Sequence, residues 1–263
     1  MTTPPDSAAV TVVKLGGSTL GQHDTSLRDI AAARRDGRQI VVVHGGGATV
    51  SDWLQRAGLE PRFVRGLRVT DAAALEIVVA VLAGLVNKQL VADLAALGAP
   101  AAGLSGADGL LLQARPHAAD LGFVGTIHHV DPRPLRDLLD RGYLPVVAPI
   151  AIEAEGAHAQ LLNTNADTAA GEIAAALAAE RLIFLTDVEG VLDGDRHLLG
   201  HLDAAEAAAL IASGVASGGM IPKLEAAVRA AVVGCATRIV NGRAEGVLAR
   251  VLAGGGGGTA VTP

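Results

Sequence analysis

The sequence has few aromatic residues, a single cysteine and no excess of basic residues. Aromatic residues make up 2% of the 263 positions while 50% are hydrophobic, so aliphatic and small side chains must build the core. This composition suits a layered α/β protein in which helices pack closely on a sheet. Cys235 alone cannot form an internal disulfide, which favours a reducing compartment, the cytoplasm. The net charge of -6 argues against nucleic acid as a partner.

The signals of secreted and membrane proteins are also lacking. The first ten residues, MTTPPDSAAV, have neither the basic start nor the apolar run of a secretory signal. Charged residues interrupt the later apolar stretches, so we expect no helix of membrane-spanning length and no membrane partner. At this length the chain is expected to form one domain, or two lobes that share one sheet.

Strand and helix patterns alternate along the chain. The β-branched runs at 11–14, 40–44 and 182–187 predict buried strands, and amphipathic segments between such runs predict helices. Helical crossovers imply a mainly parallel sheet that is covered on both faces. Residues 110–113 and 123–130 predict a hairpin-like excursion, residues 144–150 a strand, and the glycine run 254–258 an approach to a final edge strand.

Three glycine-rich loops are candidate sites, because ligands of such sheets bind where strands end. Lys14 ends the first predicted strand and is followed by Gly16 and Gly17. Glycines allow backbone N–H groups to approach an anion, and the lysine adds charge. A tight turn with an exposed lysine would have the same sequence.

The second loop follows His44 and contains Gly45, Gly46 and Gly47. Successive amides at a helix N-terminus can bind a carboxylate or phosphate, although a flexible loop would have the same sequence. We expect His44 to be a hydrogen-bonding residue at the strand end and not a ligand. Neither loop matches the P-loop or the dinucleotide-binding glycine pattern.

The third loop leads into a predicted helix with Pro222 and Lys223 in its first turn. A lysine there opposes the positive end of the helix dipole, so a negative group, such as a bound phosphate, should offset it. A solvated surface lysine is the alternative. Upstream, the NTNAD run at 163–167 opens another helix with more short polar residues than one N-cap requires. Asp167 could therefore hold the lysines, and Asn163 could contact a substrate.

These motifs recur with others in an order that resembles the amino acid kinase superfamily and, within it, the N-acetylglutamate kinases. The matching blocks are VVKLGGS at 12–18, VVVHGGG at 41–47, FVRGLRVTD at 63–71, LAGLVNK at 82–88, GLSGADG at 103–109, GYLPVVAPI at 142–150, NTNAD at 163–167, LTDVEGVLDGD at 185–195 and SGGMIPKLEAA at 217–227. The resemblance covers nearly the whole chain.

The resemblance implies an open three-layer αβα sandwich that forms a single amino acid kinase domain over residues 1–263. Residues 10–165 would form an N-terminal lobe for acceptor binding and dimerisation, and residues 166–263 a C-terminal lobe for ATP. Lys14, Lys223 and Asp167 would be catalytic, with Asp167 organising the two lysines. The acceptor, N-acetyl-L-glutamate, would be bound by Gly46, Gly47, Arg68 and Asn163. ATP would be bound by Gly16, Gly17, Thr186, Asp187, Val188, Glu189, Gly190, Val191, Val215, Ala216 and Ser217.

The reaction implied is ATP-dependent phosphorylation of the γ-carboxylate, which gives N-acetyl-L-glutamyl 5-phosphate and ADP in arginine biosynthesis. A γ-carboxylate is ionised at neutral pH, so no general base is needed. The task is to bring two anions together and to stabilise the moving phosphoryl group. We expect Mg2+ to be held mainly by the phosphates, with no dedicated protein metal site.

Two departures from the family pattern bear on regulation and acceptor choice. Only about ten residues precede the first predicted strand, where arginine-sensitive hexameric relatives carry an extra helix. We therefore expect the arginine-insensitive, homodimeric kind. The apolar segment 78–97 is a candidate dimer-facing helix, although a helix buried within the domain would have the same pattern. The loop after Gly17, STLGQHDTSL, differs from the small loop of many members and could alter how the acceptor is held.

Three other functions are alternatives to this reaction. A kinase for carrier-linked aminoadipate would share the fold and the chemistry, but it would need a basic surface for its acidic carrier. A non-catalytic anion or nucleotide sensor on the same fold should have lost one of the lysines. A dinucleotide oxidoreductase should carry the glycine fingerprint that is missing here.

Overall fold

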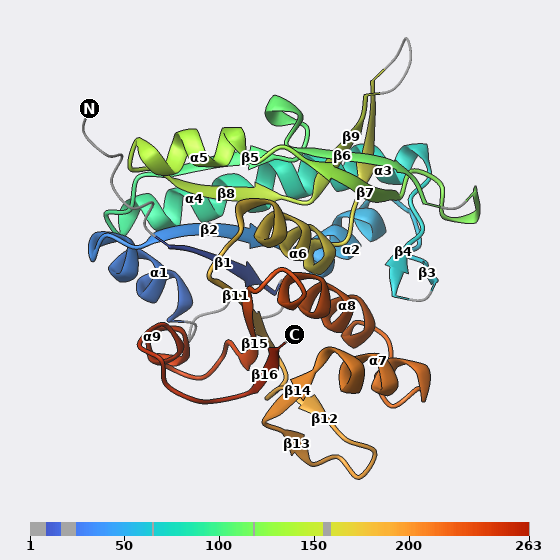
Figure 1. Cartoon of the computed structure of the whole chain (residues 1–263). Coiled ribbons are helices and arrows are strands. Elements are labelled where there is room, and N and C mark those ends of the chain that lie inside the picture. The colour runs from blue at the N-terminus through green and yellow to red at the C-terminus, as the bar shows by residue number, and fades with distance from the viewer. Residues whose placement is uncertain (1–8, 17–24, 65, 118, 155–158, 263) are drawn as a thin grey trace.

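The computed structural model describes residues 9–16, 25–64, 66–117, 119–154 and 159–262. A main sheet of eight strands runs through it in the order β14-β16-β15-β11-β1-β2-β8-β5 (Figure 1). These strands are β1 (Val10–Leu15), β2 (Gln39–His44), β5 (Ala101–Ser105), β8 (Leu144–Ala148), β11 (Arg181–Thr186), β14 (His201–Asp203), β15 (Ala236–Asn241) and β16 (Thr259–Thr262). Their pairings are parallel except for that of β15 with β16.

Helices cover both faces of this sheet, as predicted (Figure 1). One face carries α1 (Ser26–Arg35), α4 (Asn87–Ala96) and α9 (Val247–Leu252), and the other carries α5 (Arg133–Asp140), α6 (Ala166–Leu177) and α8 (Met220–Ala231). Alternate strand residues serve the two faces: Val12 lies in the core with α6 and α8, whereas Val13 lies in the core with α1 and α9. The three-layer αβα prediction is therefore confirmed.

Smaller elements surround the carboxyl edge of the sheet. The helices α2 (Gly47–Arg56) and α3 (Ala72–Val79) and the π-helix η1 (Ala80–Val86) share a third core, and α7 (Ala204–Ala212) precedes α8. A second sheet has the order β10-β9-β6-β7, formed by β6 (Leu112–Pro116), β7 (Gly125–Val130), β9 (Ile150–Glu153) and β10 (Gln160–Asn163). Short 3-10 turns occur at η2 (Asp108–Leu110) and η3 (Ala119–Leu121). Two hairpins pair β3 (Phe63–Val64) with β4 (Leu67–Arg68) and β12 (Val191–Leu192) with β13 (Leu198–Leu199).

Two strand predictions were wrong in detail. The predicted strand 144–150 is divided between β8 in the main sheet and β9 in the second sheet, because Pro149 has no N–H with which to continue the ladder. The strand after the glycine run, β16, is not an edge strand, since β14 pairs with its outer side. The excursion predicted at 110–113 and 123–130 is confirmed as the antiparallel pair of β6 and β7.

The helical segment Ala72–Ala96 differs from the sequence-based expectation. It is long enough and apolar enough to cross a membrane, with a mean hydropathy of 1.7 over its 18-residue window, so the expectation of no helix of membrane-spanning length was wrong. Glu76 and Lys88 do interrupt the apolar run. Here the segment packs against the sheet through Leu90 and Leu94, and a core helix passes the same length and composition test. Two other expectations rest on the N-terminal segment and on the loop after Gly17, of which residues 1–8 and 18–24 lie outside the described residues.

Candidate active site

The order of the strands places a ligand crevice at the carboxyl end of β1. β1 pairs with β2 on one side and with β11 on the other, while α1 and α6, which lead into these two neighbours, cover opposite faces of the sheet. Such a switch point opens a crevice beyond the strand ends. α6 precedes β11 and α8 precedes β15, so both helices begin at this same edge.

Three buried charged side chains meet at the crevice. Lys14 Nζ lies 2.8 Å from Asp167 Oδ1, and Lys223 Nζ lies 3.0 Å from Asp167 Oδ2. The three residues are at most 7% exposed. Two ammonium groups and one carboxylate leave one positive charge without a partner inside this cluster. Burial makes such a charge costly unless an anion joins it, so the cluster is suited to a phosphoryl group.

Close packing of two helices brings Asp167 to Lys223. A Cβ atom added to Gly171 of α6 would lie 2.9 Å from Ala226 Cβ of α8, which shows how closely the helices approach. Lys14 stands opposite Phe184 on the neighbouring strand, and Lys223 Nζ lies 5.3 Å from the centre of the Phe184 ring. The ring thus provides an apolar surface next to the ammonium group of Lys223.

The cluster shifts the protonation equilibria of its members. Burial alone would raise the pKa of Asp167, but the two lysines outweigh it and hold the pKa of the carboxyl below its usual value. Burial lowers the pKa of Lys223, and Lys14 adds to this effect while Asp167 and Asp187 oppose it. The Asp167 carboxylate is therefore ionised at neutral pH. The positive charge of Lys223 is disfavoured by burial and by Lys14 and is favoured by the nearby carboxylates.

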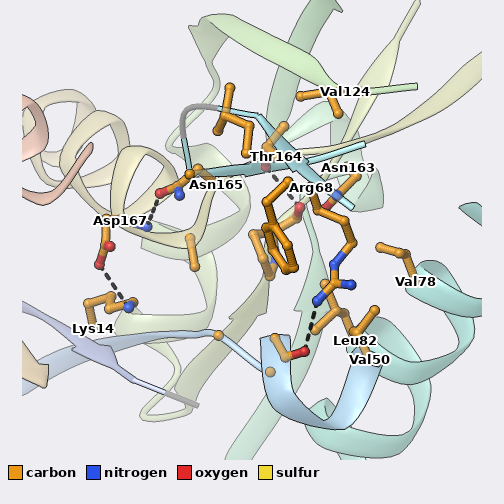
Figure 2. A pocket seen from close by; sticks show the side chains of 18 residues that line it. Lys14, Val50, Arg68, Val78, Leu82, Val124, Asn163, Thr164, Asn165 and Asp167 are labelled. Atoms are coloured by element: carbon orange, nitrogen blue, oxygen red, sulfur yellow. Dashed lines mark hydrogen bonds and ion pairs between the residues drawn. The ribbon is translucent and has the colours of Figure 1, made fainter. Parts of the chain in front are cut away.

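A cavity of about 180 Å³ extends from this cluster toward the β3–β4 hairpin (Figure 2). Figure 2 shows the pair of Lys14 and Asp167 on one side of the pocket and Arg68 across from it. The full lining comprises Lys14, Gly45, Gly46, Gly47, Val50, Phe63, Gly66, Leu67, Arg68, Val78, Leu82, Val124, Pro149, Asn163, Thr164, Asn165, Ala166 and Asp167. The cavity therefore has cations at two separated places and apolar walls between them.

Hydrogen bonds from one nitrogen of the Arg68 guanidinium hold the side chain in place, while another nitrogen remains available to a ligand. Its Nη2 donates to Gly47 O at 2.8 Å and to Ser51 Oγ at 2.9 Å, and its guanidinium lies 4.7 Å from the centre of the Phe63 ring. Nη1 is buried and has no hydrogen-bond partner among the residues that the structure describes, and burial lowers the pKa of the group. A buried unpaired donor on a cation is a specific position for an anionic acceptor group.

Gly46, Gly47 and Asn163 lie in the same cavity, so the predicted acceptor-binding residues come together with Arg68. Gly46 and Gly47 begin α2, and Asn163 Nδ2 donates to Thr70 Oγ1 at 3.0 Å. The N-cap that the sequence demanded for α6 is Asn165, whose side chain accepts from the N–H groups of Asp167 and Thr168. Asn163 is therefore not used for capping and keeps its place at the cavity wall.

A second cavity of about 470 Å³ lies beside α8 and the β12–β13 hairpin. Six of the residues predicted to bind ATP line it, namely Val188, Gly190, Val191, Val215, Ala216 and Ser217. The lining does not include three others, Thr186, Asp187 and Glu189. Thr186 Oγ1 donates to Asp187 Oδ1 at 3.3 Å, and Glu189 accepts from Asn241 Nδ2 at 2.6 Å. Gly16 N donates to Leu185 O at the end of β1, and Gly17 lies outside the described residues.

Several lining residues were not predicted. In the first cavity these include Phe63 and Leu82. Ser51, which accepts a hydrogen bond from Arg68, was not predicted either. In the second they are Leu192, Asp193, Gly194, Arg196 and Met220. Within the described residues, no group of three or more His, Cys, Asp or Glu side chains is arranged as a metal site.

Comparison with known proteins assigns the family. The profile of the amino acid kinase family matches residues 9–241. The chain belongs to the amino acid kinase family. The resemblance found in the sequence is thus confirmed.

The amino acid kinase has similar relatives over nearly its whole length. The acetylglutamate kinase of Dehalococcoides mccartyi (strain ATCC BAA-2266 / KCTC 15142 / 195) is 46% identical over 255 residues, which cover 96% of this chain and 94% of that protein. The solved structure of smu.665 from Streptococcus mutans UA159 is similar with a TM-score of 0.83 at 29% identity, over 96% of this chain and 98% of that one. N-acetylglutamate synthase from Neisseria gonorrhoeae, complexed with coenzyme A and N-acetyl-glutamate, is similar with a TM-score of 0.83 at 28% identity, over 97% of this chain and 59% of that one.

Proposed function

We propose that this amino acid kinase transfers the γ-phosphoryl group of ATP to the γ-carboxylate of N-acetyl-L-glutamate, in arginine biosynthesis. The observation that carries the proposal is the cavity that joins the buried cluster of Lys14, Asp167 and Lys223 to the unpaired Nη1 of Arg68. An acceptor with two carboxylates needs a cation at each end. The relatives named acetylglutamate kinase support the same acceptor.

Arg68 binds the α-carboxylate of the acceptor in this proposal. Its guanidinium is held by Gly47 O and Ser51 Oγ, so little side-chain entropy remains to be lost on binding. Asn163 and the amides of Gly46 and Gly47 complete the contacts along the cavity. The apolar residues Val50, Leu82 and Val124 leave no polar group to satisfy along the aliphatic part of the acceptor.

Phosphoryl transfer then takes place at the lysine end of the cavity. The γ-carboxylate oxygen attacks the γ-phosphorus in line, a new P–O bond forms, and the bond to the β-phosphate oxygen breaks to release ADP. No proton has to be removed from the nucleophile. Lys14 and Lys223 stabilise the charge on the moving phosphoryl group, and Asp167 holds them at 2.8 and 3.0 Å.

ATP occupies the second cavity with its phosphates directed toward Lys223. Asp187, which follows the end of β11, raises the pKa of Lys223 by its charge and so belongs to the same electrostatic environment. Both oxygens of Asp167 face ammonium groups, so this carboxylate is already engaged. Mg2+ held mainly by the phosphates fits such a donor set and would neutralise phosphate charge when bound.

The proposal also assigns the two substrates to separate lobes and the protein to a homodimer. Residues 10–165 form the acceptor lobe and residues 166–263 the ATP lobe, because the first cavity draws chiefly on the former and the second on the latter. A cytoplasmic homodimer is expected, with the long helical segment Ala72–Ala96 at the interface. Leu85 of this segment is 48% exposed, which is consistent with a role in contact between subunits.

The test is an acceptor panel. ADP formation is measured with glutamate, N-acetylglutamate, aspartate and aminoadipate derivatives, each at the same concentration with ATP and Mg2+. We expect turnover that depends on an added acceptor and is fastest with N-acetylglutamate. Absence of turnover with every acceptor would refute the kinase assignment, and faster turnover with N-blocked aminoadipate would reassign the acceptor.

A further inference from the structure

His44 lies directly beneath the glycine loop and is fully buried. It ends β2, has an exposed fraction of 0%, and precedes Gly45 and Gly46. Its Nδ1 lies 2.7 Å from Gly45 O. A carbonyl oxygen can only accept a hydrogen bond, so Nδ1 must carry the proton.

Asn87 fixes the other side of the ring. Asn87 Oδ1 accepts from Lys88 Nζ at 3.0 Å, and Nδ2 donates to Val146 O at 2.9 Å, which together define the orientation of the amide. The same Nδ2 lies 3.2 Å from His44 Nε2 and 3.3 Å from Leu104 O. Because an amide nitrogen can only donate, and Nδ1 carries the ring proton, Nε2 can only be the acceptor in its contact with Asn87. Burial, together with the charges of Lys14 and Lys88, lowers the pKa of His44 to about 4 against the opposing bond to Gly45. The ring is therefore neutral and held in one tautomer at pH 7.

Glycines at two positions allow the side chains of Asn87 and Leu82 to pack closely against the backbone around the 45–47 loop. A Cβ atom at Gly103 would lie 2.1 Å from Asn87 Oδ1, and one at Gly46 would lie 2.6 Å from Leu82 Cδ2. Leu82 belongs to the π-helix η1, and Asn87 is the first residue after it. Such irregular helices occur frequently at functional sites. Leu82 therefore packs against Gly46 of the 45–47 loop, and Asn87 contacts His44, which precedes the loop.

The geometry of one peptide unit connects His44 to the cavity. The Gly45 carbonyl and the Gly46 N–H share a planar trans unit and point in opposite directions. When the imidazole holds the carbonyl, the direction of the Gly46 N–H is fixed as well. Gly46 lines the same cavity as Lys14 and Arg68.

We propose that His44, oriented by Asn87, is a positioning residue that aims the Gly46 N–H at the reacting carboxylate and phosphoryl group. This inference rests on the proposed function, because it assigns the Gly46 amide to the reacting end of the acceptor. His44 touches no substrate; it acts through the Gly45–Gly46 peptide. Its loss should lower kcat more than it raises the KM for the acceptor.

Two variants separate positioning from packing. In His44→Asn the amide nitrogen takes the place of Nδ1 and keeps the bond to Gly45 O, but the bond to Asn87 is lost and a small cavity remains. In His44→Gln the distal amide takes the place of Nε2 and keeps the bond to Asn87, but the bond to Gly45 O is lost. Gln fills the space of the ring better than Asn, so a purely structural role would favour His44→Gln in both stability and activity.

The measurements are kcat, the acceptor KM and the melting temperature of both variants and the wild type. We expect kcat of His44→Gln to fall about tenfold or more below that of His44→Asn, with acceptor KM values within about threefold of each other, whichever variant melts higher. Values of kcat that are equal in the two variants, or that follow the melting temperatures with His44→Gln ahead, would overturn the proposal.

A spectroscopic measurement on the resting wild-type protein does not depend on turnover. The 15N chemical shifts of the His44 ring should show a protonated Nδ1 and an unprotonated Nε2 at pH 7. A protonated Nε2 would overturn the positioning role even in an active enzyme. Failure of the wild type to phosphorylate any acceptor would instead refute the proposed function, and with it this role for the Gly46 amide, whatever the tautomer.

Discussion

Replacement of Asp167 by asparagine tests whether the three-residue cluster is held together by charge. The substitution preserves the size of the side chain and its place in the first turn of α6, but it removes the only carboxylate that pairs with both Lys14 and Lys223 at 2.8 and 3.0 Å within the cluster. Removing one partner of a buried ion pair typically costs about 3–5 kcal/mol. We expect Asp167→Asn to lower the free energy of unfolding by about 3 kcal/mol and to lower kcat as well, because the two ammonium groups then repel each other.

The same two helices supply a matched control. Arg229 Nε of α8 lies 3.2 Å from Glu172 Oε1 of α6, and these side chains are 49% and 25% exposed. Such an accessible pair contributes about 0–1 kcal/mol, so Glu172→Gln should change stability and kcat little. Urea unfolding of both variants gives the comparison. If Asp167→Asn is within about 1 kcal/mol of Glu172→Gln, the account of the buried cluster is wrong.

The pH dependence of the Asp167 effect has a definite sign. The pKa of Asp167 in the folded protein is held below its ordinary value of 3.8. Its stabilising contribution is therefore fully present above this value and is lost as the pH falls through the lowered folded pKa. The difference in stability between wild type and Asp167→Asn should persist from neutral pH to about pH 4.

Three other substitutions test separate parts of the site. Lys223→Met should lower kcat by about 100-fold or more, which steady-state kinetics would measure. The free energy of unfolding should change by about 1 kcal/mol or less, because burial of the Lys223 ammonium opposes folding; urea unfolding would measure this change. Arg68→Lys should raise the acceptor KM about 10- to 100-fold through loss of the unpaired Nη1, whereas Arg62→Lys on the exposed surface should leave it unchanged. Because the folded pKa of His44 is about 4 and its ordinary value is 6.5, its contribution to stability is present above pH 6.5 and lost as the pH falls. From pH 7 to 5 the wild type should lose about 2 kcal/mol more than His44→Asn.

Much of the fold follows from local sequence patterns. Residues 11–14 and 40–44 predicted their strands because continuous β-branched runs suit a sheet that is buried on both faces. The division at Pro149 was missed because the apolar pattern continues across it, and the second sheet is defined by pairing at long range. The outer position of β14 was likewise not visible, since a three-residue strand has no distinctive periodicity.

The candidate site was predictable where a residue type conflicts with its local setting. Lys223 near the start of a helix requires a negative group. In the structure that group is Asp167, whereas the sequence was equally compatible with a bound phosphate. Arg68 was recognised through family motifs and not through local physics, whereas Asn163 was also indicated by the surplus of short polar residues before α6. The support of the glycine loop by Asn87 was missed, because its contact with His44 joins residues 43 positions apart.

The central claim is that the γ-carboxylate of N-acetyl-L-glutamate receives the phosphoryl group. The most direct measurement traps the acyl phosphate product with hydroxylamine and compares the amount of hydroxamate with the ADP formed in the same reaction. The account predicts one hydroxamate for each ADP with the wild type, and neither product above background with Lys223→Met. Formation of ADP without hydroxamate, or an undiminished yield from Lys223→Met, would contradict it.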